Sequence, residues 1–239
     1  MNLFMKYLVK FILNIFDYFT LKKVMKKIEF LIGKNFSKAI DVGSHHGEYI
    51  LSIKKNFNIK EIYGFEPNPV AFKILKKNII NHSGINIFNY GIADIEGEKI
   101  LNQNIESSSS SINSLNKNSK YYKKKYFLFN FLNLKKISNS VKIKAINLAN
   151  FIEEKKIDKI DLLKIDTEGY EFKIIKGLGK NISKIKLIHL EHHFDDMIIK
   201  NYKLSDIHNY LKNNNFTKVF KIKMKFRKSF EYIYMNKNF

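Results

Sequence analysis

The stretch "DLLKIDTEGYE", residues 161–171, decides the fold. Its first half is almost continuously apolar, which is typical of a strand that is covered on both faces of a parallel sheet. Its second half brings three carboxylates close together, Asp166, Glu168 and Glu171. Like charges at such short spacing repel one another. The end of this strand is therefore expected to meet a cation or to serve a reaction that needs a proton acceptor.

Short apolar runs alternate with longer helical patterns on both sides of this stretch. We expect strands at 38–42, 61–66, 85–92, 161–166 and 186–191, and helices at 49–53, 68–79, 148–157, 169–178 and 204–214. The runs "FTKVFKI" and "FEYIYM" predict a C-terminal antiparallel pair. Strands that alternate with helices form crossover units. The sequence thus predicts an α/β fold with a mostly parallel sheet and helices on both faces.

Four of the expected strands end in a carboxylate. These residues are Asp41, Glu66, Asp166 and Glu191. Ligands of open parallel sheets bind beyond the carboxyl ends of the strands. The regularity therefore predicts a ligand site at this edge.

Composition bounds the class of protein. The chain has 239 residues, of which 45% are hydrophobic, and it has no cysteine. This length suits one globular domain, and disulfides, thiolate zinc sites and a cysteine nucleophile are excluded. A cytoplasmic location is expected. The net charge of +21 suggests an anionic partner, but lysine is spread over every element and Arg227 is the only arginine. Nucleic acid, which proteins commonly read with arginine, is therefore not favoured as the partner.

The N-terminal residues 1–35 form a segment distinct from the rest of the chain. Lys6, Lys10, Asn14 and Asp17 interrupt its apolar residues at helical spacing, which predicts an amphipathic helix. The segment is too polar for a transmembrane span. Three roles remain open for residues 1–30: packing on the protein's own core, pairing in a homodimer, or peripheral contact with a membrane.

Residues 36–239 are expected to form the main domain, with an insertion at about 106–140. The insertion contains five successive serines, 107–111, and the basic aromatic run "KYYKKKYFLFNF". We expect a polar loop and then a helix, placed over the ligand face. Aromatic residues among lysines also suit the stacking of single-stranded RNA.

The loop "DVGSHHGEY", 41–49, follows the first expected strand. Gly43 and Gly47 allow a ligand to approach the backbone closely, and the next helix offers free N–H groups. An acidic residue, Asp41, opens the loop where a dinucleotide site leaves room for a pyrophosphate. This arrangement suits the amino-acid end of S-adenosylmethionine.

The next two strand ends add further ligand candidates. Glu66 lies where an acidic side chain binds a ribose diol in related sheets, and Pro67 stiffens its turn. Asp94, in "NYGIAD", is placed to contact an adenine amine, although a plain turn residue explains it equally well.

Together, "AIDVGSHHGEY", "YGFEPNP", "ESSSSS", "LLKIDTEGYE" and "IHLEHH" resemble the FkbM-type methyltransferases, over roughly residues 36–195. These S-adenosylmethionine-dependent O-methyltransferases often act on sugars, polyketides and other natural products. The resemblance implies a Rossmann-like class I methyltransferase fold with a seven-stranded sheet and a C-terminal antiparallel hairpin. It implies that Asp41, Gly43 and Gly47 belong to the cofactor loop, Glu66 to the ribose, and Asp166, Glu168 and Gly169 to the active-site turn. With the candidates from the residues themselves, the expected cofactor site consists of Asp41, Gly43, Ser44, His45, Gly47, Glu66, Pro67, Asp94 and Asp166. The family usually has Ala-Asn in place of Ser44-His45, so the role of that side chain is open.

Methyl transfer to a hydroxyl benefits from a general base. Asp166, Glu168 and His193 are the candidates, since a histidine titrates near neutral pH without a shift. Alternatively, Asp166 and Glu191 hold a divalent metal that acidifies the hydroxyl. Lys164 is expected to be exposed or near the cofactor. Adjacent histidines point apart, so His45-His46 is not expected to bind zinc.

The sequence thus favours an O-methyltransferase for a sugar, glycan or other small molecule. Two alternatives remain, an RNA-binding protein or RNA methyltransferase, and a cofactor-binding domain without catalysis.

Overall fold

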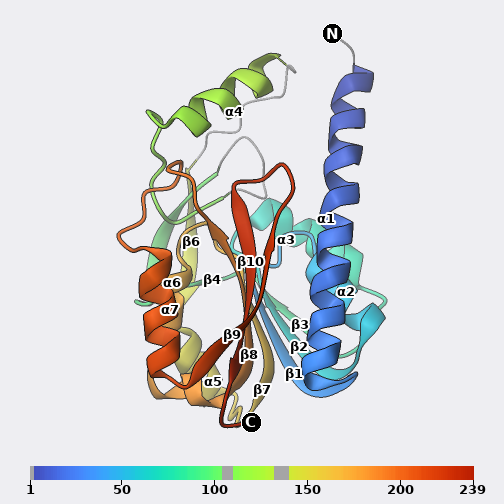
Figure 1. Ribbon diagram of the computed structural model, residues 1–239, viewed down its shortest axis with the longest axis vertical. Coiled ribbons are helices and arrows are strands. Elements are labelled where there is room, and N and C mark those ends of the chain that lie inside the picture. The colour runs from blue at the N-terminus through green and yellow to red at the C-terminus, as the bar shows by residue number, and fades with distance from the viewer. Residues whose placement is uncertain (1–2, 104–109, 132–139) are drawn as a thin grey trace.

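A computed structural model describes residues 3–103, 110–131 and 140–239 (Figure 1). Its main body is a seven-stranded sheet in the order β3-β2-β1-β7-β8-β10-β9. The strands are β1 (Asn35–Val42), β2 (Asn58–Phe65), β3 (Ile85–Phe88), β7 (Ile160–Ile165), β8 (Ile185–His193), β9 (Phe216–Lys223) and β10 (Ser229–Asn236). The first five in spatial order are parallel, and β10 runs antiparallel to both β8 and β9. The predicted seven-stranded sheet and its C-terminal hairpin are confirmed.

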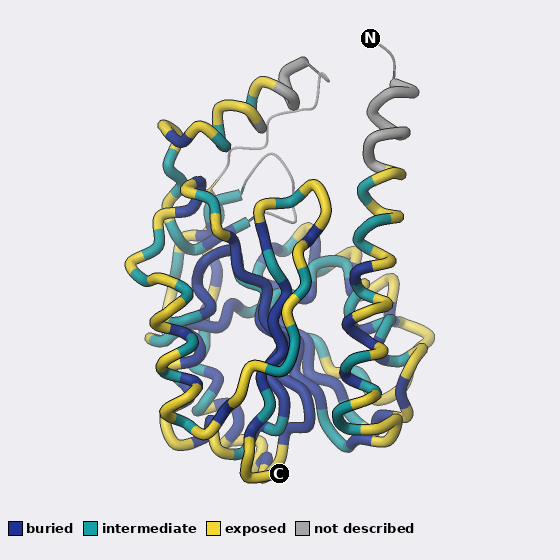
Figure 2. Tube along the Cα trace, viewed as in Figure 1, coloured by how far each residue is buried: buried dark blue, intermediate teal, exposed yellow. Residues whose placement is uncertain are grey.

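Helices cover both faces of this sheet (Figure 1). They are α1 (Leu3–Ile32), α2 (Glu48–Asn56) and α3 (Pro69–Ile79) on one face, and α5 (Leu148–Glu154), α6 (Glu171–Gly177) and α7 (Leu204–Asn213) on the other. A 3-10 helix, Gly179–Lys184, links α6 to β8. Because successive strand residues point to opposite faces, each strand feeds two cores. Ile40 and Leu163 face α5–α7, whereas their neighbours Ala39 and Leu162 face α1–α3. Figure 2 shows the strands as the buried centre of the molecule.

A second, three-stranded sheet was not expected from the sequence. It has the order β4-β6-β5 and consists of β4 (Gly91–Ile92), β5 (Gly97–Asn102) and β6 (Ser140–Ile146). The strand expected at 85–92 is in fact divided between the two sheets. The side chain of Asn89 donates to the backbone oxygens of Glu66 and Pro67, which turns the chain out of the first sheet.

The segment between β5 and β6 lies where the insertion at 106–140 was expected. It contains α4 (Lys120–Phe131), so the predicted basic aromatic helix is present. Of the five serines, 107–109 lie outside the described residues. Ser111 forms an isolated bridge with Asn102.

The lower half of α1 packs on the sheet through Val24, Met25 and Ile28, each at most 2% exposed. Its upper half extends beyond the sheet (Figure 1). Among the described residues, no helix has the length and apolar character that a membrane span requires.

Candidate active site

The loop between β1 and α2 sits directly against the end of β7. Backbone N–H groups of Gly43 and Ser44 donate to the Phe65 oxygen, and the Asp166 N–H donates to the Val42 oxygen. Gly43 has a φ of +88°, and a Cβ there would lie 1.9 Å from the Asp166 backbone oxygen. Only glycine fits such a position. The first loop and the acidic turn after β7 therefore form one surface.

Glu66 fastens this loop to the turn after β2. Its Oε2 accepts the His45 N–H at 2.7 Å, and its Oε1 accepts the Asn68 N–H at 2.7 Å. Burial raises the pKa of Glu66 to about 7, against the effect of these bonds. A carboxylate oxygen can accept more than one hydrogen bond. Glu66 can thus hold the loop and still receive ligand hydroxyl groups.

Asp41 is 1% exposed, and its Oδ2 has no hydrogen-bond partner among the described residues. Burial raises the pKa of Asp41 to about 7, although Lys164 and the Ser44 hydroxyl oppose the shift. Buried polar atoms are nearly always satisfied, so an unpartnered carboxylate oxygen indicates a place for a ligand donor. The Ser44 hydroxyl donates to the Asp41 backbone oxygen at 3.0 Å. The side chain of Ser44 therefore supports the loop.

Asp94 accepts the Tyr170 hydroxyl at 2.6 Å. Burial opposes ionisation here, but this bond and the charge of Lys173 lower the pKa of Asp94. The structure thus gives Asp94 a partner in the turn after β7. Its expected contact with an adenine amine stays a prediction.

Lys164 and Asp166 form an ion pair, with 3.1 Å between Nζ and Oδ2. The Lys164 side chain is only 5% exposed, which excludes the first of its two expected settings, and its place near the cofactor stays a prediction. Lys164 and Asp166 stand two residues apart and so lie on the same side of the chain. Burial opposes ionisation of Asp166, but Lys164, His193 and Arg227 lower its pKa. Asp166 is an ionised hydrogen-bond acceptor at neutral pH, and 32% of its side chain remains exposed.

The turn after Asp166 is held from several sides. Glu168 and Gly169 have left-handed φ values of +51° and +97°. Glu171 accepts the Gly169 N–H at 2.7 Å and also the Tyr202 hydroxyl, so it supports the turn. The Ser111 hydroxyl donates to the Glu168 backbone oxygen at 2.7 Å. The serine motif thus reaches the acidic turn.

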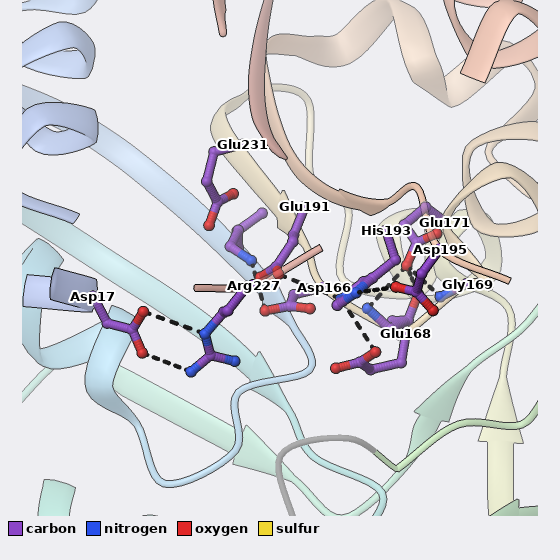
Figure 3. A network of polar contacts seen from close by, with 12 residues as sticks. Asp17, Asp166, Glu168, Gly169, Glu171, Glu191, His193, Asp195, Arg227 and Glu231 are labelled. Carbon is purple, nitrogen blue, oxygen red and sulfur yellow. Dashed lines mark hydrogen bonds and ion pairs between the residues drawn. The ribbon is translucent and has the colours of Figure 1, made fainter. Parts of the chain in front are cut away.

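His193 lies among three carboxylates (Figure 3). Its Nε2 is 3.1 Å from Glu168 and 3.3 Å from Glu191, and its Nδ1 is 3.6 Å from Asp195. Burial alone would lower the pKa of His193, but these carboxylates raise it to about 10. The ring is therefore already protonated at neutral pH. His193 thus links the acidic turn to β8 through its carboxylate partners, and its expected role as general base stays a prediction.

Glu191 differs from its neighbours in its protonation. Burial, together with the charges of Asp166 and Glu231, raises the pKa of Glu191 to about 8. Glu231 reaches this cluster from β10 and pairs with His189 at 2.8 Å.

The similarity of this chain to known proteins assigns it to a family. The model of the methyltransferase FkbM domain matches residues 41–218, well over half of the chain. The chain belongs to the FkbM methyltransferase family.

Individual relatives agree with this assignment. A hexuronic acid methyltransferase, AglP of Haloferax volcanii, is 27% identical over 156 residues, which are 64% of this chain and 54% of that protein. The chain thus spans about half the length of that relative.

Two solved structures share the fold. The FkbM methyltransferase of Methylobacillus flagellatus is 16% identical with a TM-score of 0.51, over 83% of this chain and 44% of that one. TrmK of M. capricolum, solved with S-adenosyl-homocysteine, is 13% identical with a TM-score of 0.50, over 89% of this chain and 67% of that one. These likenesses show that the chain has a Rossmann-like fold.

In this FkbM methyltransferase the adjacent histidines do not point apart as expected. His45 has a φ of +45°, and the two rings stack with centroids 3.6 Å apart. Their Nδ1 atoms lie 3.3 and 3.6 Å from Glu48 Oε1. Within the described parts of the chain, His45, His46 and Glu48 are the only group of three residues that could hold a metal ion. Among these described residues, Asp166 and Glu191 belong to no such group.

Sequence reasoning missed the members of the site that come from distant strands. Glu231 lies on β10, and Arg227, in the loop before it, pairs with Asp17 of α1 (Figure 3). The sequence did contain an indication of Glu231, because it is the one acidic residue in the apolar run "FEYIYM". A charged side chain on a buried strand lacks water to solvate it and therefore needs a partner inside the protein.

Proposed function

We propose that this FkbM methyltransferase transfers a methyl group from S-adenosylmethionine to a hydroxyl of a sugar or glycan. The buried, unpartnered Oδ2 of Asp41 beside the Gly43 turn carries the cofactor assignment. A cationic amino group fits such an acceptor. Glu66 is the proposed partner of the ribose hydroxyls, with Pro67 and Asp94 further along the same edge. The backbone of Gly43, Ser44, His45 and Gly47 is proposed to line the amino-acid end.

When bound, S-adenosylmethionine supplies a methyl group on a positively charged sulfur. A hydroxyl acceptor must release its proton as it receives that methyl group. Asp166 is the proposed recipient of the proton. It is ionised, and at 32% it is the most exposed of the central acidic and histidine side chains. Glu168 is 8% exposed and His193 10%, and the two are paired with each other. We assign them to holding the turn.

A sugar acceptor is favoured by the relative AglP, which is named a hexuronic acid methyltransferase. An acidic sugar would also suit a chain with a net charge of +21. The divalent metal considered from the sequence is not part of the proposal, because Asp166 has Lys164 as its counter-ion.

The test is methyl transfer from S-adenosylmethionine to a panel of nucleotide sugars, lipid-linked sugars and glycans, with neutral and uronic acid members, and to total RNA. An O-methylated sugar identified by mass spectrometry would support the proposal. Methylated RNA without methylated sugar would assign the chain to RNA modification instead. Cofactor binding measured by calorimetry without transfer to any acceptor would favour a domain that binds but does not catalyse.

A further inference from the structure

The upper half of α1 carries a single stripe of exposed apolar side chains. Its members are Phe11 (62% exposed), Ile12 (40%), Ile15 (37%), Tyr18 (55%) and Phe19 (53%). They occupy positions i, i+1, i+4, i+7 and i+8. With 3.6 residues per turn, these positions fall within about 120° of the helix surface. We call this set the α1 stripe.

The α1 stripe faces away from the rest of the protein because the opposite side of the helix is held. Asp17 receives two hydrogen bonds from Arg227, at 2.6 and 3.2 Å. Phe16 packs edge-on against Phe226, with ring centroids 5.0 Å apart. Both partners lie in the turn between β9 and β10. These two contacts fix the rotation of α1 about its axis, so the α1 stripe does not face the sheet.

Lysines continue the same face toward the domain. Lys22 and Lys26 follow Phe11 by 11 and 15 residues, which returns them to the direction of the stripe, and both are exposed. Lys23, also exposed, borders them. One helix face therefore has apolar side chains and then a cluster of positive charge.

Helix α4 lies at the same end of the molecule. Figure 1 shows α4 and the upper half of α1 projecting past the end of the sheet at which β1 and β7 reach the candidate active site. Lys123 and Lys124 of α4 are exposed, and Phe127 is 72% exposed. Both helices thus project at the end of the molecule that carries the candidate active site, and each combines lysine with exposed aromatic residues.

We propose that α1 docks on an anionic lipid bilayer, with the α1 stripe in the headgroup region and Lys22, Lys23 and Lys26 against lipid phosphates. A helix with apolar residues on one face and nearby lysines binds such a surface through buried apolar area and attraction to anionic lipids. The net charge of +21 favours an anionic surface over a second copy, because two copies repel one another. The helix lies on the bilayer and does not cross it.

Docking in this way sets the axis of α1 along the bilayer surface, so the end of the sheet past which α1 projects lies beside the membrane (Figure 1). If the proposed function holds, which this step alone requires, the acceptor sugar is one carried on a membrane lipid.

Vesicle flotation tests the docking itself. The full chain is mixed with vesicles of phosphatidylcholine, or of phosphatidylcholine with phosphatidylglycerol, at physiological salt. We expect binding to the anionic vesicles only, and roughly tenfold weaker binding for Phe19→Glu, the scale of one aromatic side chain kept out of the interface. The matched control is Ile80→Glu, which places the same charge at another exposed apolar residue (76%), past the end of α3. Circular dichroism checks that both variants stay folded.

Three results would overturn the proposal. Wild-type protein that stays off the anionic vesicles is one, and equal binding of Phe19→Glu and Ile80→Glu is another. The third is a wild-type dimer, seen by light scattering, that Phe19→Glu converts to a monomer without any vesicle binding. That outcome would assign the α1 stripe to a second copy of the chain.

Discussion

Lys164 and Asp166 form an ion pair at the end of the central strand, 3.1 Å apart, with the lysine buried and the carboxylate still partly exposed. Burial alone would lower the pKa of Lys164, but the nearby carboxyl groups of Asp166, Glu231, Glu191 and Asp41 together raise it. One buried cation thus balances part of a cluster of acids. The arrangement keeps Asp166 ionised while its carboxylate remains accessible to an acceptor.

Asp166→Asn is expected to abolish most methyl transfer. The amide keeps the shape of the side chain but cannot take up the acceptor proton, so turnover should fall roughly 100-fold or more. Cofactor affinity, measured by calorimetry, should stay near that of the wild type. Because Lys164 loses its nearest partner, the free energy of unfolding should also fall, by about 1–2 kcal/mol, a cost that partial exposure keeps below that of a fully buried pair.

Near-normal turnover of Asp166→Asn on its true acceptor would remove Asp166 from the transfer step. Glu168 would then be the carboxylate to test, since His193 is already protonated.

Glu66→Ala should weaken cofactor binding by about 1–3 kcal/mol, the cost of losing a charged hydrogen-bond partner. The substitution also frees the N–H groups of His45 and Asn68, which Glu66 holds at 2.7 Å. The control is Glu61→Ala, which removes a carboxylate from β2, the strand before Glu66, away from the ligand edge. Calorimetry on both variants decides the point. Equal affinities would show that Glu66 only supports the loop.

The local pattern of the sequence predicts the strands that position the site. Apolar runs specify where β1, β2, β7 and β8 lie, and parallel pairing then brings their carboxyl ends to one edge. The same two-residue period could have paired Lys164 with Asp166 from sequence, because residues i and i+2 share a face.

Partners that are distant in the chain could not be predicted in this way. Asp17 and Arg227 are separated by 210 residues, and their contact depends on how α1 packs beside the β9–β10 hairpin. The protonation of His193 has the same origin, because it depends on Glu168 and Asp195 meeting the ring in space. Sequence spacing carries no information on such electrostatic neighbourhoods.

Gly43→Ala should disrupt the junction between the first loop and the acidic turn. A methyl group there would meet the Asp166 backbone oxygen, which cannot move without breaking the bond from the Asp166 N–H to Val42. Gly33→Ala is the control, because Gly33 has a similar φ of +79° but open space around it. The control should lose about 1–2 kcal/mol of stability from backbone strain alone. Gly43→Ala should lose more, and cofactor binding with it, in denaturant unfolding and calorimetry.

His193 should stabilise the protein in a defined range of pH. Its pKa is raised from 6.5 to about 10 in the folded state. A raised pKa means that the stabilisation is complete below about pH 6.5 and is lost as the pH rises through about 10. The difference in unfolding free energy between wild type and His193→Gln should therefore shrink between pH 7 and pH 10.5. The exposed His82, changed to Gln, is the control for the loss of a surface histidine. A constant difference for His193→Gln would contradict its protonation in the folded state.

Removal of divalent metal should leave methyl transfer unchanged. Asp166 has a lysine counter-ion, and among the described residues neither Asp166 nor Glu191 belongs to a group of three metal ligands. Turnover should be the same with EDTA as with added Mg²⁺ or Mn²⁺. If chelation instead abolishes turnover, two places for the metal can be compared. One is the loop, where the Nδ1 atoms of His45 and His46 lie 3.3 and 3.6 Å from Glu48 Oε1, and the other is the acidic turn at Asp166. A tetrahedral zinc site requires a spacing of about 3.3 Å. His46→Gln would then reduce metal affinity in calorimetry if the ion sits at the loop, and Asp166→Asn would do so if it sits at the acidic turn. Either result would replace the base mechanism with one that depends on a metal.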